Sequence, residues 1–128
     1  MLLNDVLRWR RESAERKRLA VAEHRARLET AATDLLVGFQ RYVMLDEVGE
    51  QLAQAGEQAA DARQEAAREL ADVVIRAMSQ ILVLSDSART REASERLVIE
   101  ATNRQVSAHV RTDFVAAIRS ELGRSDGR

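Results

Sequence analysis

An apolar repeat with a spacing of seven residues runs through the first third of the chain. Its members are Leu7, Ala14, Val21, Leu28, Leu35 and Tyr42. Helices with such a stripe pack side by side as coiled coils or bundles, because the repeat keeps one face toward the partner. The companion apolar positions are filled by Leu3, Ala31 and Leu45. Between them, the same positions are polar: Arg10, Lys17 and His24. We therefore expect strong packing from Leu28 to Leu45 and an N-terminal half that projects or docks elsewhere.

The composition favours an all-helical fold. The chain has 128 residues, of which 45% are hydrophobic, and it contains five glycines, no proline and no cysteine. Many of the apolar residues are alanines, which remove little area from water, so a long shallow interface is easier to build than a thick core. We expect one all-α domain over residues 1–122, an elongated antiparallel helical bundle or coiled coil of about three long helices.

Local signals set the expected helix boundaries. Gly49 and Gly56 weaken a continuous helix near residues 45–50. The stretch SDSA, which begins at Ser85, has side chains that compete with helix hydrogen bonds and cap the next helix. Asn4 and Gly123 are candidate caps at the two ends. The expected helices are residues 5–47, 50–84 and 88–122, followed by a flexible tail at 123–128.

The sequence contains no pattern typical of catalysis or of metal binding. It has no cysteine nucleophile, no GxSxG turn and no glycine-rich phosphate loop. His24 and His109 are isolated and lack the spacing that places two ligands on one helix face. We therefore expect a non-enzymatic protein with no cofactor and no metal.

The N-terminal sequence indicates neither export nor membrane insertion. The start MLLNDVLRWRR lacks the apolar run and the cleavage site of a signal peptide. No stretch approaches the ~20 apolar residues that are needed to span a bilayer. We expect a cytoplasmic protein without a transmembrane segment.

Two apolar faces are candidate surfaces for a protein partner, for self-association or for an apolar particle. The first turns carry Leu3, Val6, Leu7 and Trp9 on one broad side of a helix. The last expected helix carries Val110, Phe114 and Ile118. An apolar face with a polar rim is suited to packing against a partner helix or against an apolar surface.

Charge is distributed unevenly along the chain. Residues 31–75 are acidic, with a net charge of −6, whereas residues 1–30 and 76–128 carry +3 and +2. The candidate anion-binding residues are Arg8, Arg10, Arg11, Arg16, Lys17 and Arg18. Several charges have i, i+4 spacing, such as Arg8 with Glu12, which is typical of a solvated helix. We do not expect nucleic acid to be the partner, although a steep salt dependence of DNA binding would favour it.

One stretch, ARTREASERLVIEATNRQ, resembles part of a known family. It is similar to a segment of the phasins, helical proteins that coat polyhydroxyalkanoate storage granules. The matching positions are Ala88, Arg89, Thr90, Glu92, Ala93, Leu97, Glu100, Arg104 and Gln105. The resemblance implies a cytoplasmic, self-associating amphipathic protein without enzymatic activity.

Two other stretches resemble different assembly proteins. The segment from Arg11 to Leu36 resembles the helical repeats of the gas-vesicle outer coat protein. The stretch LNDVLRWRRESAERKRL resembles the start of the coiled-coil stalk proteins of flagellar and type III export machines. The leading hypothesis is a helical coat or scaffold on the surface of a large assembly. The alternative is a coiled-coil adaptor or stalk protein of a protein complex, and a nucleic-acid binder is the third hypothesis.

Overall fold

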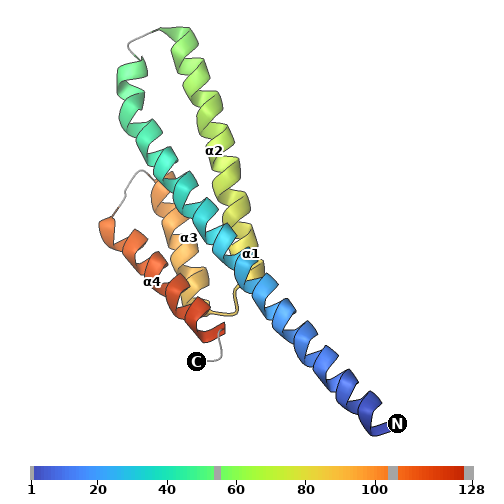
Figure 1. Ribbon diagram of the computed structural model, residues 1–128. Helices are drawn as coiled ribbons and strands as arrows, with labels where there is room; N and C mark the ends of the chain where they lie inside the picture. Colours follow the sequence, from blue (N-terminus) through green and yellow to red (C-terminus); the bar gives the residue numbers. More distant parts are fainter. Residues whose placement is uncertain (1, 54–55, 104–106, 126–128) are drawn as a thin grey trace.

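The protein is built from two helical hairpins. The computed structural model describes residues 2–53, 56–103 and 107–125. Within these ranges the chain forms four helices: α1 (Leu2–Ala53), α2 (Glu57–Leu84), α3 (Ala88–Thr102) and α4 (Ala108–Ser125). α1 and α2 form a long antiparallel hairpin, and the shorter α3–α4 hairpin packs against its lower half (Figure 1). The expected all-α class is confirmed, but the described residues form four helices instead of three.

The boundary between α1 and α2 lies later than expected. α1 continues through residues 45–50 to Ala53. One helical glycine costs about 1 kcal/mol relative to alanine, which a long helix tolerates. Gly56, directly before α2, has φ 113°, a value that side chains rarely allow. The start of α2 therefore depends on Gly56 and not on Gly49.

The predicted helix over residues 88–122 is wrong, because the chain folds back within it. α3 ends at Thr102, and the amide of Asn103 donates to the carbonyl of Ile99 at 3.0 Å. The Glu100 carboxylate accepts a hydrogen bond from the Ser107 amide at 3.3 Å, just before α4. Folding back brings the apolar face of α4 against the apolar faces of α3 and α1, so that these faces are removed from water.

The proposed end caps also differ. α1 begins at Leu2, so Asn4 lies inside the helix. α4 continues through Gly123 to Ser125, so this glycine is not its C-terminal cap. The predicted flexible tail begins at residue 123, but residues 123–125 belong to α4; residues 126–128 lie outside the described residues.

The turn between α2 and α3 is where the sequence places it. α2 ends at Leu84, and the Ser87 hydroxyl caps α3 by accepting from the Thr90 amide at 3.4 Å. The Glu121 carboxylate, on α4, accepts from the Ser85 hydroxyl at 2.8 and 2.9 Å and from the Asp86 amide at 3.0 Å. These bonds tie the end of α4 to the turn.

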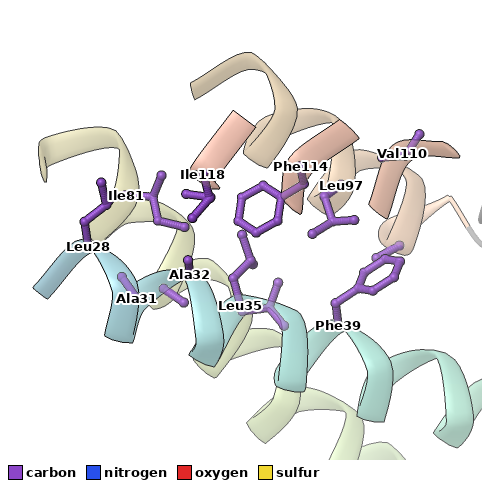
Figure 2. Close-up of a cluster of buried hydrophobic side chains, with 13 residues drawn as sticks. Leu28, Ala31, Ala32, Leu35, Phe39, Ile81, Leu97, Val110, Phe114 and Ile118 are labelled. Carbon is purple, nitrogen blue, oxygen red and sulfur yellow. The ribbon is translucent and has the colours of Figure 1, made fainter. Parts of the chain in front are cut away.

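The core lies where all four helices meet. In Figure 2, Leu35 of α1 points toward Phe114 of α4, and Leu97 of α3 lies beside them. Val74, Ala77 and Ile81 of α2 complete one side. Thr90 is fully buried, and its hydroxyl donates to the Ala117 carbonyl at 3.4 Å, linking α3 to α4. The core therefore begins at Leu28 of α1, at the left of Figure 2, and extends along α1 to Phe39.

Candidate docking surface on the N-terminal arm

Burial along α1 begins abruptly at Leu28. Leu28 is 2% exposed, whereas none of residues 2–27 is buried. We call residues 2–27 the N-terminal arm, which extends away from the bundle in Figure 1. The prediction of a projecting N-terminal half is confirmed, and its cause is the replacement of apolar companion positions by Arg10, Lys17 and His24.

The arm forms a helix although only its last turn, at Ala26 and Arg27, lies beside another helix, α2. It contains neither glycine nor proline, and it is rich in alanine, arginine, glutamate and leucine, which are strong helix formers. Glu12 accepts salt bridges from Arg8 at 3.4 Å and from Arg16 at 3.8 Å, both at i, i+4 spacing. Such pairs each contribute about 0.2–0.5 kcal/mol. The helix is also extended from the packed part of α1, which avoids the cost of nucleation.

The apolar stripe of the arm continues the stripe that forms the core. Leu7, Ala14 and Val21 precede Leu28 at the same seven-residue spacing. Leu7 and Val21 are both 48% exposed, because no helix covers this part of the face. The arm therefore presents to solvent the face that the bundle buries further along α1.

Basic residues flank this stripe in a regular pattern. Pairs recur every seven residues: Arg10-Arg11, Lys17-Arg18 and His24-Arg25. The polar residues at the companion positions alone do not reveal this surface. The seven-residue repeat of the basic pairs is the sequence pattern that predicts it. Arg8, Glu12 and Arg16 lie on the opposite side of the helix, where Glu12 pairs with both arginines. Among the described residues, Arg10, Arg11, Lys17 and Arg18 take part in no salt bridge.

The tip of the arm exposes large apolar side chains. Leu2 is 84% exposed, Leu3 75% and Trp9 64%. Val6 is also exposed. The structure therefore places the first predicted apolar face, Leu3, Val6, Leu7 and Trp9, at the end of the arm that lies farthest from the bundle (Figure 1).

The second predicted apolar face is not a surface. Val110, Phe114 and Ile118 are 1%, 0% and 7% exposed. The residues lie on one side of α4, and that side packs into the core because α4 folds back onto α3 and α1. These three residues are core residues, and the prediction that they bind a partner is wrong.

The phasin-like stretch coincides with α3. Thr90 and Leu97 are buried, whereas Arg89 and Glu92 are exposed. Arg104 and Gln105 lie outside the described residues. The matched positions are thus divided between the core and the surface.

Grooves between the helices are found among the described residues of the body, and two of them are of similar size. The first, of about 660 Å³, lies between α1 and α4 and is lined by Phe39, Val43, Met44 and Val115, with Arg111 and Arg119 at its rim. The second, of about 640 Å³, lies between α1 and α2 and includes Ala26, Thr30, Ser79 and Val83. Within the described ranges, no three acidic, histidine or cysteine side chains gather where they would hold a metal ion. No helix there is long and apolar enough to cross a membrane.

Comparison of the chain with protein-family models, with curated proteins and with solved structures finds no match.

Proposed function

We propose that this protein is a non-enzymatic helical scaffold that attaches to a larger assembly through its N-terminal arm. The observation that carries the proposal is the unburied continuation of the core stripe beyond Leu28. A helix stripe of this kind is stabilised by covering it, since burying one large apolar side chain contributes about 1.5–3 kcal/mol. A partner that covered the exposed side chains of the arm would gain this free energy of burial.

A protein helix fits the arm better than a featureless surface does. The basic pairs stand beside the apolar stripe at every seventh residue, at Arg10, Lys17 and their neighbours. A partner helix with carboxylates at a matching spacing satisfies both the stripe and its charged rim. This favours the adaptor function, in which the arm joins the folded body to another helical protein.

A granule coat is the second candidate, and the exposed tip supports it. Leu2, Leu3 and Trp9 suit insertion into an apolar polymer surface, with Arg8 and Arg11 at the rim. The phasin resemblance of Ala88 to Gln105 adds a storage granule in the cytoplasm as the expected place of action. Since Phe114 and its neighbours are buried, this coat function would rest on the arm alone.

Trp9 provides the test, because it is the only tryptophan and lies on the arm. Its fluorescence reports on docking without a label. Acrylamide should quench Trp9 readily in the free protein, and docking should shift its emission to the blue and protect it. Polyhydroxyalkanoate particles, duplex DNA and the chain itself at increasing concentration are the probes.

Protection by polymer particles alone would support the coat function, and protection that requires another protein chain would support the adaptor function. Leu3→Ser combined with Leu7→Ser should abolish either response, because it removes two large apolar side chains from the docking face. Both side chains are exposed, so their loss leaves the core intact. Protection by DNA that disappears at high salt would assign the arm to nucleic acid and refute the proposal. It would also fail if Trp9 remained freely quenched in native complexes isolated through a C-terminal tag.

A further inference from the structure

The chain carries two uncovered surfaces of opposite charge. The N-terminal arm has a net charge of +4 over residues 2–27, and the first part of α2 has −3 over residues 57–72. None of residues 2–27 and none of residues 56–73 is buried. We propose that the arm docks on α2 of a second copy of this chain. The inference rests on the proposed function, since it names the partner of the same arm.

The exposed side of α2 carries a row of carboxylates. The row comprises Glu57, Asp61, Glu65, Glu69 and Asp72, all exposed. The first four follow one another at four-residue spacing, where like charges on a helix destabilise it. Among the described residues none of these carboxylates forms a salt bridge. A cationic helix laid beside α2 removes this repulsion and gains attraction in its place.

In the described part of the chain, the upper end of α2, residues 57–73, contributes no buried residue to the core. The α3–α4 hairpin covers only the lower half of the α1–α2 hairpin (Figure 1), and the inward residues Ala59, Ala66 and Leu70 remain half-buried. Two helices alone cannot enclose a side chain between them. These residues lie on the side of α2 that faces α1, roughly opposite the carboxylate row, as do the buried Val74 and Ala77 further along the helix, so the row itself remains open to a helix from another copy.

The direction and the length of α2 match those of the arm. α1 and α2 are antiparallel, so a second copy turned end over end runs its arm in the same direction as α2. The arm covers 26 residues, or roughly 40 Å, and α2 covers 28 residues, which is nearly the same length. In a two-fold pair, each arm therefore spans the α2 helix of the other copy.

The charge spacing sets the register. Arg10 and Lys17 are seven residues apart, and so are Glu65 and Asp72. Two helices that run in the same direction keep both pairs aligned, Arg10 with Glu65 and Lys17 with Asp72. The same register brings Val21 level with Arg76, one residue beyond Ile75, which is 51% exposed, beside the groove that Val83 lines. Pairing of two arms with each other is disfavoured, because it would bring Arg10 and Lys17 against like charges.

Charge reversal in the full chain tests the pairing. The arm variant is Arg10→Glu with Lys17→Glu, and the α2 variant is Glu65→Lys with Asp72→Lys. Wild-type protein should sediment as a dimer at low salt and dissociate as salt rises. Each variant should weaken association by about tenfold or more, because two attractive pairs per contact become repulsive. Arg8→Gln with Arg16→Gln, on the opposite side of the arm, removes two positive charges without placing like charges at i, i+4 spacing and should leave association nearly unchanged, whereas Arg10→Gln with Lys17→Gln, the same loss of charge, should weaken it.

Mixing the two variants gives the decisive result. In the mixed pair, one contact joins the two wild-type surfaces and the other joins the two reversed surfaces, so both contacts are complementary. The mixture should therefore dimerise when neither variant does alone. Circular dichroism should show that every variant remains helical, since all the changed residues are exposed. A mixture that stays monomeric, or an α2 variant that associates like wild type, overturns the inference.

A monomeric wild-type chain would also overturn the inference but would leave the proposed function open to its own test. In that case, protection of Trp9 by another protein would still assign docking to the arm. Loss of both, no dimer and no protection in native complexes, would refute the second-copy inference and the arm-docking function together.

Discussion

Phe114 should be among the most stabilising side chains in the protein, although its place in a charged, amphipathic C-terminal segment predicts a surface position. It is 0% exposed and lies between Leu35 and Leu97 (Figure 2). Phe114→Ala removes the ring and leaves a cavity, so we expect the free energy of unfolding to fall by about 3–5 kcal/mol. Trp9→Ala is the matched control, because Trp9 is an aromatic residue 64% exposed on the arm. It should change the free energy of unfolding by less than about 0.5 kcal/mol.

Urea denaturation followed by circular dichroism separates these outcomes. With a slope of about 1.5 kcal/mol per M, the Phe114→Ala midpoint should fall by about 2–3 M. Both variants should be measured at a concentration where the chain is monomeric, since association adds apparent stability. If Phe114→Ala fails to fold, Phe114→Leu should still fold and lose about 1–2 kcal/mol. Equal midpoints for Phe114→Ala and Trp9→Ala would refute the folded-back position of α4.

Two further perturbations examine the packing around the core by the same denaturation assay. At Gly38 a Cβ would lie 2.9 Å from Cγ2 of Val74, so Gly38→Ala should destabilise the protein by about 1–3 kcal/mol despite the better helix propensity of alanine. Gly123→Ala, which meets no atom within 4 Å, should instead be neutral or stabilise by up to about 1 kcal/mol. Glu121→Ala should cost about 1–3 kcal/mol, because it leaves the buried Ser85 hydroxyl with a single weaker acceptor. Glu121→Gln, which keeps an acceptor oxygen, should cost less; equal losses would argue against the hydrogen bonds.

The first half of α1 was predictable because its periodicity carries both the signal and its interruption. A stripe that is apolar at every seventh residue and basic at the companion positions can form a helix but cannot complete a core. The change from Lys17 and His24 to Ala31 therefore marks the start of burial at Leu28. The turn at Ser85 was predictable for a local reason, since its hydroxyl groups cap helix ends.

The fold-back between α3 and α4 was not predictable by the same means. The stretch before Ser107 contains neither proline nor glycine, and its weak helix formers, Thr102, Asn103 and Ser107, are separated by Arg104, Gln105 and Val106 instead of forming a cluster such as SDSA. The helix is interrupted because of tertiary packing. Folding back buries Phe114 and Val110 against Leu97, whereas a continuous helix would leave these side chains in water. With one helix assumed, Phe114 had no interior to enter and was assigned to a surface. Likewise, the carboxylate row on α2 was visible in the sequence only as a net charge, because its exposed side depends on which side α1 covers.

The arm and the core share a single uninterrupted helix, and this limits how the chain can change in length. Inserting one residue between Lys17 and Leu28 would turn everything before it by about 100° around the helix axis and move it by about 1.5 Å. The basic pairs would then face away from the side they now share with the core stripe. An insertion of seven residues would restore the orientation to within about 20°. Among homologous chains, the arm should therefore vary in length in steps of seven residues. The connection between α3 and α4 is not part of a continuous helix, so its length should vary one residue at a time.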